Sequence, residues 1–290
     1  MLTLLRLTRP LNLLLAALTY SLGFGLAHYL GVPYDAIAFW LGLVAVLLTQ
    51  MSMSLLAEVF RPYSDPILPD ETLVQRRSLR DSMLYLSIGA LAALAVISFL
   101  LYNTGHISGT ALLFVGFSLL LSLLYGVPPL RLVGRGFGEL TLALQLAYVI
   151  PSLGFLLQAA DYHRLLAMLV FPLVALAFAC FLALDFPTYA QDRKYDRRTL
   201  LVLLGWERAV PLHHIFVVAA YLIFLAAPIF GFSLNLLWPA FLTLPFALLQ
   251  IFLLRGIAEG GKPIWTLLTV TAIAVFGLTA YFLTLTFWLR

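Results

Sequence analysis

The sequence has one cysteine and few charges. Cys180 stands alone among 290 residues, which excludes an internal disulfide, and its apolar surroundings favour a small core residue over a reactive thiol. Asp, Glu, Lys and Arg together make up only 10% of the chain, whereas soluble domains contain about 25%. These absences exclude a secreted disulfide scaffold and a water-soluble enzyme.

Apolar residues are abundant instead, at 63% of the chain. Nine stretches have, or nearly have, the length of about 20 residues that a helix needs to cross a bilayer. They cover approximately residues 11–31, 36–57, 83–102, 109–127, 137–158, 164–184, 210–230, 233–253 and 264–288. Backbone polar groups inside lipid must find partners within their own segment, so we expect helices. The sequence therefore predicts an all-α, multi-pass membrane protein with a single transmembrane domain over residues 1–290.

The basic residues predict an orientation. Fifteen of the 17 Lys and Arg residues fall at the N-terminus or in every second connection, and only Arg164 and Arg290 fall on the opposite face. Lys and Arg accumulate in cytoplasmic loops, so we expect the first face to be cytoplasmic, in the inner membrane of a cell. Eleven of the 13 acidic residues share that face. We therefore expect the ionisable chemistry there, with the bilayer as a partner and no nucleic acid.

Two acidic clusters on this face have the same spacing. Each has two carboxylates seven residues apart and a polar residue three positions after the first; they are Glu58, Arg61 and Asp65 after the second span, and Asp185, Thr188 and Asp192 after the sixth. On a helix these positions share one face. The spacing predicts that each cluster directs its oxygens toward a single point.

Carboxylates arranged in this way fit a hard cation such as Mg²⁺, which takes oxygen ligands and often bridges to substrate phosphates. A diphosphate is the substrate group that such a metal serves. For either cluster alone, solvated acids paired with neighbouring arginines are an equally good account. The repetition of the spacing on one face favours the metal interpretation.

The connection between the fourth and fifth spans carries a third motif. Its double proline ends the preceding helix, and its glycines permit a tight return into the next one. Arg131 could hold phosphate or could simply follow the orientation rule. Glu139 stands where the next helix is expected to start, and the helix dipole favours an acid at that position.

Several segments follow one known pattern. They are Arg9-Pro10, the acid clusters after spans two and six, and Tyr125-x-x-Pro128-Pro129-x-Arg131-Leu132-x-x-Arg135-Gly136-x-Gly138-Glu139. With these features the chain resembles the UbiA superfamily of intramembrane prenyltransferases over nearly its whole length. The residues after the second cluster, Arg193-Lys194, Arg198-Thr199-Leu200 and Gly205, resemble members that prenylate naphthoate, homogentisate or chlorophyll precursors.

The resemblance implies a fold and a reaction. The fold is a ring of helices around a central cavity, in which both acid motifs hold Mg²⁺ and an isoprenyl diphosphate. The prenyl chain passes to an aromatic or quinone-precursor acceptor, as in quinone biosynthesis. The implied catalytic metal ligands are Glu58, Asp65, Asp185 and Asp192. The implied substrate contacts are Arg131, Thr188, Tyr189, Arg193 and Lys194.

The first motif departs from the family pattern Asn-Asp-x-x-Asp-x-x-x-Asp. Ala57 replaces the Asn, Glu58 the first Asp and Arg61 the middle Asp, while Thr188 holds the middle place of the second motif. Two other hypotheses therefore stay open. One is a catalytically inactive lipid- or quinone-binding protein on the same fold, and the other is a transporter, which also places acids within a membrane.

Overall fold

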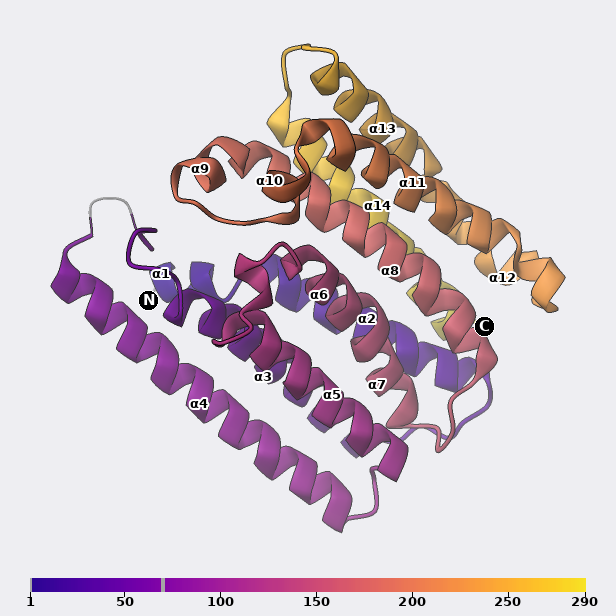
Figure 1. The fold of residues 1–290 in the computed structure, drawn as a ribbon. Coiled ribbons are helices and arrows are strands. Elements are labelled where there is room, and N and C mark those ends of the chain that lie inside the picture. The colour runs from indigo at the N-terminus through magenta and orange to yellow at the C-terminus, as the bar shows by residue number, and fades with distance from the viewer. Residues whose placement is uncertain (1, 69–70) are drawn as a thin grey trace.

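The computed structural model describes residues 2–68 and 71–290, and every regular element among them is helical (Figure 1). Nine segments within these residues are long and apolar enough to cross a membrane, which confirms the predicted all-α, multi-pass fold. The long helices are α2 (Pro10–Tyr29), α3 (Ala36–Val59), α4 (Leu73–Asn103), α5 (Gly109–Gly126), α8 (Arg164–Asp185), α11 (Trp206–Leu225), α13 (Leu244–Ala258) and α14 (Trp265–Trp288).

Shorter elements complete the remaining spans and the connections. The fifth span combines α6 (Gly138–Leu144), a π-helical turn (Gln145–Val149) and α7 (Ile150–Leu156). The other elements are α1 (Leu2–Leu7), α9 (Tyr189–Lys194), α10 (Leu200–Leu204), α12 (Leu234–Leu237) and 3-10 turns at Leu132–Gly134, Phe186–Thr188, Ala227–Phe230 and Trp238–Thr243.

Local signals in the sequence set several helix starts. The Asp35 side chain accepts hydrogen bonds from the backbone N–H groups of Ile37 and Ala38 and so caps α3. Thr72 and Gln75 form a capping box at the start of α4. Because of this cap, α4 begins ten residues before the predicted third span, and its first turns lie outside the apolar stretch.

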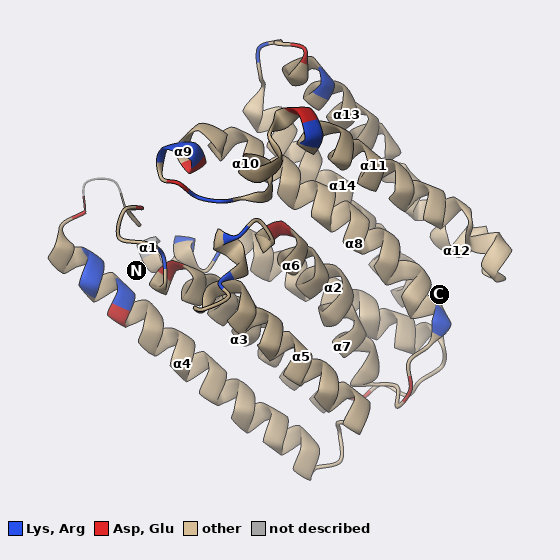
Figure 2. Ribbon diagram, in the orientation of Figure 1, with Lys and Arg blue, Asp and Glu red and all other residues tan. Residues whose placement is uncertain are grey.

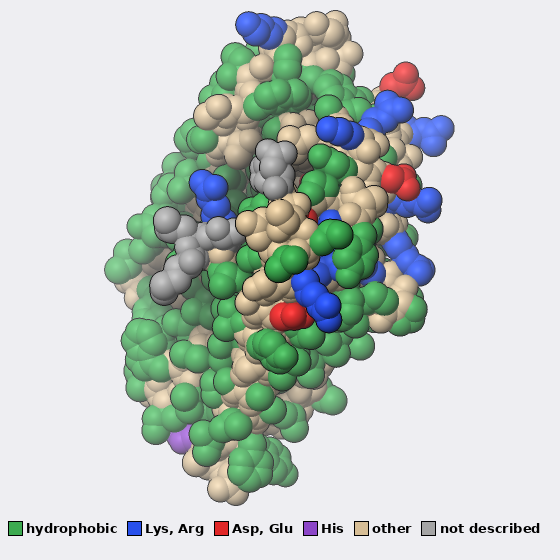
Figure 3. All heavy atoms as spheres, turned by 90° about the vertical axis from the view of Figure 1, so that its left-hand side faces the viewer, with side chains coloured by type: hydrophobic (Ala, Val, Ile, Leu, Met, Phe, Trp, Pro, Cys, Tyr) green, Lys and Arg blue, Asp and Glu red, His purple; other side chains and the backbone are tan. Residues whose placement is uncertain are grey.

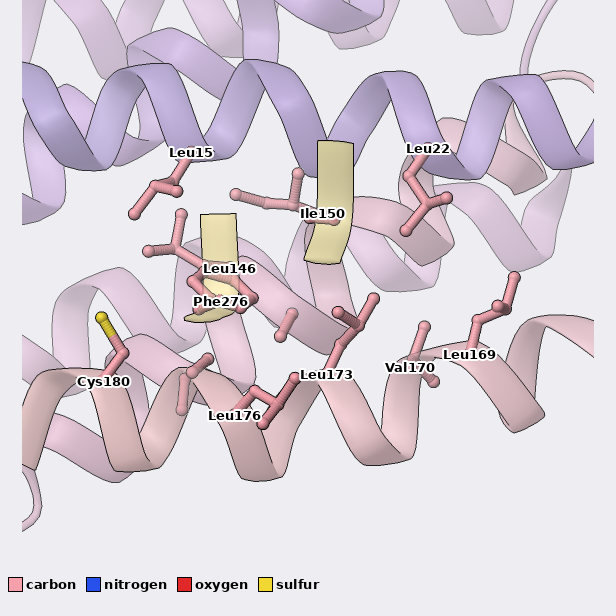
Figure 4. Close-up of a cluster of buried hydrophobic side chains, with 14 of the residues drawn as sticks. Leu15, Leu22, Leu146, Ile150, Leu169, Val170, Leu173, Leu176, Cys180 and Phe276 are labelled. Carbon is pink, nitrogen blue, oxygen red and sulfur yellow. The ribbon is translucent and has the colours of Figure 1, made fainter. Parts of the chain in front are cut away.

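The core lies between α2, the fifth span, α8 and α14. Leu15 and Leu22 of α2 point toward Leu173 and Leu176 of α8, with Ile150 between the two helices (Figure 4). All five side chains are at most 1% exposed. This contiguous apolar packing fixes the helices whose ends carry the polar residues.

Two glycines allow α2 and α7 to approach closely. A Cβ atom on Gly23 would lie 1.8 Å from the backbone oxygen of Pro151, and one on Gly154 would lie 2.2 Å from the backbone oxygen of Tyr20. Any side chain at these positions would push the two backbones apart. Helices α2 and α7 can therefore approach this closely only because both positions are glycine.

Charged residues gather at one end of the helical bundle, and we call this the polar end (Figure 2). It carries the N-termini of α2, α4, α6 and α11 and the C-termini of α3, α5, α8 and α13. Away from it the surface is mainly hydrophobic, as the space-filling view shows for one side (Figure 3). Exposed Leu113 and Phe252 lie within spans and face outward, as lipid-facing side chains do.

Candidate active site

A cavity of about 500 Å³ opens at the polar end. This volume lies within the range of about 300–1,000 Å³ typical of small-molecule sites. Its polar lining includes Arg9, Glu58, Arg61, Asp65, Tyr125, Arg131, Glu139, Asp185, Thr188, Asp192, Asp196, Arg197 and Arg198. Its apolar lining includes Leu11, Ala57, Val133, Leu142, Phe181 and Leu184. Both predicted acid clusters therefore face one chamber.

The first cluster does not lie on one helical face, and that detail of the prediction is wrong. Helix α3 ends at Val59, so Glu58 belongs to its last turn whereas Arg61 and Asp65 follow the helix. Pro62 cannot supply the N–H that would continue the helix. Asp65 reaches the cavity from a turn instead of from a helix face.

Arg76 of α4 holds that turn in place. Its guanidinium donates hydrogen bonds to the backbone oxygens of Pro62 (2.6 Å), Tyr63 (2.6 Å) and Asp65 (2.7 Å). Arg76 is only 5% exposed, and a buried guanidinium needs such acceptors. The early start of α4 thus positions the Asp65 carboxylate.

Glu58 lies between two arginines. Its carboxylate is 2.7 Å from Arg61 Nη2 and 3.3 Å from Arg9 Nη2. Arg9 also donates a hydrogen bond of 2.9 Å to the hydroxyl of Tyr125. Close packing of α5 on α3 supports this arrangement, since a Cβ atom on Gly126 would lie 2.7 Å from the backbone nitrogen of Ala57.

Arg197 joins the two clusters. Its Nε and Nη2 atoms donate to the two oxygens of Asp65 at 2.7 and 2.8 Å, and Nη1 donates to Asp192 at 3.0 Å. Both carboxylates are buried, at 2% and 3% exposure. The hydrogen bonds that Arg197 donates to Asp65 raise the pKa of Arg197 above its ordinary value, and the Asp65 charge adds to this, although partial burial acts in the opposite direction.

The second cluster keeps its members together across a change of helix type. Helix α8 ends at Asp185, a 3-10 turn with Pro187 follows, and α9 begins at Tyr189. The hydroxyl of Thr188 donates to Oδ2 of Asp192 at 2.9 Å. Asp185, Thr188 and Asp192 all line the cavity.

Asp185 and Glu139 form a close pair of carboxyl groups. Both line the cavity, and Oδ2 of Asp185 and Oε2 of Glu139 are buried without a hydrogen bond from any described residue. The other Glu139 oxygen accepts the backbone N–H of Leu200 at 2.9 Å. Neighbouring carboxyl groups with buried, unpartnered oxygens favour a proton or a cation at these atoms.

Strained backbone is concentrated at this cavity. Among the described residues other than glycine, positive φ angles occur at Arg9 (53°), Arg131 (37°) and Asp196 (50°), and all three line the cavity. Such strain persists where surrounding structure enforces it, and it often marks functional sites. Burial and the nearby charge of Arg61 lower the pKa of Arg131, and its Nε has no hydrogen-bond partner among the described residues.

Three predicted substrate contacts lie outside this lining. The Arg193 guanidinium lies 5.9 Å from the centroid of the Tyr189 ring, and that ring packs against Trp206. Arg193 and Lys194 are exposed. Their roles stay predictions, and the described cavity is formed without them.

Sequence reasoning missed the role of Arg197 and left Arg9 and Glu139 without firm roles. Arg9 and Arg197 count toward the orientation signal, which hides any second role. A clue was available, because buried carboxylates need cationic partners. The spacing within each cluster could not reveal a pair separated by 132 residues, such as Arg197 and Asp65.

Comparison with known proteins identifies the family. The model of the UbiA prenyltransferase family matches residues 70–263. The chain belongs to this family. No curated protein matches significantly in sequence.

Solved structures share the UbiA fold along nearly the whole chain. A UbiA homolog from Archaeoglobus fulgidus bound to DMAPP and Mg²⁺ is 16% identical, with a TM-score of 0.69, over 97% of this chain and 99% of that one. The same homolog bound to GPP and Mg²⁺ gives 17% identity and a TM-score of 0.66, over 98% and 99% of the two chains. A digeranylgeranylglyceryl phosphate synthase structure gives 15% identity and a TM-score of 0.65, over 99% of this chain and 98% of that one.

The two acid clusters differ in how well they fit a metal ion. In the second cluster, the unpartnered buried oxygens of Asp185 and Glu139 fit a cation. In the first cluster, guanidinium groups already contact Glu58 and Asp65. As they stand, no three Asp, Glu, His or Cys side chains within residues 2–68 and 71–290 form a complete metal site. Other oxygen ligands, such as the Thr188 hydroxyl or substrate phosphates, would have to complete it.

Proposed function

We propose that this UbiA-family protein is a Mg²⁺-dependent intramembrane prenyltransferase. It transfers an isoprenyl chain from its diphosphate to an aromatic or quinone-precursor acceptor. The observation that supports this most is the meeting of two acid clusters, 127 residues apart between Glu58 and Asp185, over one cavity that also has apolar side chains in its lining. The relatives solved with DMAPP or GPP and Mg²⁺ add support for the donor class.

The diphosphate binds at the polar mouth of the cavity. Arg131 contacts it directly, because guanidinium groups form paired hydrogen bonds to phosphate oxygens. Asp185, Asp192 and Thr188, together with Glu139, hold Mg²⁺ through oxygen atoms. When bound, the metal stabilises the negative charge that develops on the departing diphosphate.

The prenyl chain lies against the apolar lining. Leu11, Leu142 and Phe181 exclude water from the carbon that loses its diphosphate. At that carbon the bond to diphosphate oxygen breaks and a bond to the acceptor forms, and the acceptor loses a proton. The aromatic face of Phe181 stabilises positive charge on the allylic carbon.

The orientation follows from the charge distribution. We place the polar end, and with it the cavity mouth, on the cytoplasmic side of an inner membrane, because Lys and Arg are concentrated there. Residues 1–290 act as one transmembrane domain. A soluble diphosphate then reaches the arginines from the cytoplasm while the prenyl chain enters the membrane interior.

The test uses the purified full-length chain in lipid nanodiscs. DMAPP, GPP and longer isoprenyl diphosphates are offered with Mg²⁺ and a panel of aromatic, quinone-precursor and alkylated glyceryl phosphate acceptors. We expect a prenylated product by mass spectrometry, abolished by EDTA and by Asp185→Asn. If no acceptor is prenylated while donors bind in the cavity, the proposed transferase activity is wrong.

The ion pairs of Glu58 and Asp65 favour a second candidate function, an inactive isoprenoid- or quinone-binding protein on the same fold. Arg61→Asp with Thr188→Asp restores the family's acidic positions. Activity that appears only in this double variant supports the binding protein. Activity already present in the unaltered chain rejects it.

A further inference from the structure

The first acid cluster has its negative charge neutralised from within the chain. Arg61 contacts both of its carboxylates, at 2.7 Å from Glu58 and 3.5 Å from Asp65. Arg9 adds a second contact to Glu58, and Arg197 adds two hydrogen bonds to Asp65. Each carboxylate therefore has two guanidinium partners.

A divalent ion at this cluster would face two costs. It would have to displace guanidinium groups from carboxylates that are only 4% and 2% exposed. The displaced arginines would then stay close to the ion as like charges in a poorly solvated place, where repulsion is strong. At the second cluster, Asp185 and the neighbouring Glu139 have no such obstacle, since one oxygen of each is unpartnered among the described residues. Asp192 has one guanidinium partner, Arg197, whereas each carboxylate of the first cluster has two.

The guanidinium groups keep unused donors toward the cavity. An arginine has five N–H groups, and Arg197 uses one on each of its three nitrogens, so about two remain. Arg131 lines the same cavity, and no described group accepts a hydrogen bond from its Nε. Diphosphate is a ligand class that suits guanidinium groups lining one cavity, because its oxygens accept paired hydrogen bonds from them.

We propose that the first cluster takes no divalent ion and that Arg131 and Arg197 bind the donor diphosphate directly at that end of the cavity. Arg9 and Arg61 balance the charge of Glu58 and Asp65, and metal binds only at Asp185, Asp192 and Glu139. The proposal rests on the proposed function, since it concerns how the same donor is held.

The first experiment counts metal ions. The detergent-purified chain is dialysed to equilibrium against buffer containing Mn²⁺ and saturating inorganic pyrophosphate, and bound Mn²⁺ is measured as the excess of total Mn²⁺ on the protein side. We expect one bound Mn²⁺ per chain, and a second one in the variant Arg61→Asp with Arg197→Gln. Two bound ions in the unaltered chain would overturn the proposal, and so would a single ion that Asp185→Asn leaves in place.

The second experiment uses single variants that keep the acids intact. By calorimetry, Arg131→Gln and Arg197→Gln raise the Kd for pyrophosphate in the presence of Mg²⁺ at least about tenfold. Arg255→Gln, which alters an exposed arginine paired with Glu259, leaves it unchanged. Unchanged affinity in both cavity variants would reject the direct contacts. If neither pyrophosphate nor GPP binds under any condition, the donor site itself is wrong and the proposed function fails with it.

Discussion

Arg197 and Asp65, 132 residues apart in the sequence, form a two-bond ion pair with distances of 2.7 and 2.8 Å. The pair links the turn after α3 to the loop after α9, and a third bond from Arg197 reaches Asp192. The two halves of the cavity wall are thus tied by one side chain. Partially buried pairs with this bidentate geometry couple more strongly than exposed ones.

The first prediction concerns this coupling. A double-mutant cycle of Arg197→Gln and Asp65→Asn, measured by unfolding in mixed micelles, should give an interaction energy of about 1–3 kcal/mol. Each single variant takes two hydrogen bonds from the remaining partner, which keeps only its other contact, Arg61 for Asp65 and Asp192 for Arg197. The double variant should therefore be more stable than the sum of the single effects suggests. Additive effects within about 0.5 kcal/mol would show that the two side chains do not couple.

The second prediction concerns Asp185. Asp185→Asn should lower the prenyl-transfer rate by about 100-fold or more. It removes a negative charge that binds the metal ion, and the ion stabilises the charge of the transition state by several kcal/mol. The matched control is Asp161→Asn, an exposed residue outside the cavity lining. Rates are measured at saturating donor and Mg²⁺. Equal rates in the two variants would remove Asp185 from the metal site.

The third prediction concerns the length of the prenyl chain. Phe181 lines the cavity, whereas Phe178, one turn earlier on α8, packs against Phe216 with ring centroids 4.5 Å apart. Phe181→Ala should therefore shift the preference toward longer isoprenyl diphosphates, and Phe178→Ala should not. Competition between two donors of different length, read by product mass, measures the shift. The same shift in both variants would mean that general loosening of α8 causes it.

The fourth prediction concerns helix packing. Gly154→Ala forces a Cβ atom toward the backbone of Tyr20 and should destabilise the protein by about 1–3 kcal/mol. Gly116→Ala, also within a span, meets nothing within 4 Å and should be neutral or slightly stabilising. Thermal unfolding in detergent compares the two. A neutral Gly154→Ala would show that α2 and α7 are not held this closely.

The fifth prediction concerns pH at the opposite end of the bundle. Burial alone would raise the pKa of Asp35, but hydrogen bonds from the backbone N–H groups of Ala38 and Ile37 and contact with His106 lower it below 3.8 overall. The carboxylate thus contributes stability that is complete above pH 3.8 and is lost as the pH falls through the folded-state pKa. Melting between pH 2.5 and 6 should show this loss in the unaltered chain and a smaller loss in Asp35→Asn. Identical pH profiles of stability in the unaltered chain and in Asp35→Asn would contradict the assignment of this loss to Asp35.

Much of the fold could be predicted from the sequence because lipid imposes a simple rule. Apolar runs of about 20 residues must be helical in a membrane, and the part of the chain that the structure describes contains nine such spans where nine were predicted. The boundaries at polar segments were less accurate. Helix α4 starts at a capping box that hydropathy does not detect, and the helix break after Val59 depends on Pro62.

The acids that line the cavity were predictable from the sequence and the arginines less so, while the catalytic and metal-binding roles of the acids stay predictions. The repeated spacing located Glu58, Asp65, Asp185 and Asp192, and all four line the cavity. The partners of these acids come from distant segments, so no local pattern could assign Arg9 or Arg197 to them. Glu139 illustrates the same limit, since its place beside Asp185 in the cavity lining depends on how α6 packs against α8.

The most direct measurement is an experimental structure of the chain with Mg²⁺ and a non-reactive thio-analogue of geranyl diphosphate. The account predicts the diphosphate between Arg131, Arg197 and Asp185, the prenyl chain against Phe181, and one metal ion at the second cluster. A diphosphate bound elsewhere, or an analogue that leaves this cavity empty, would contradict it.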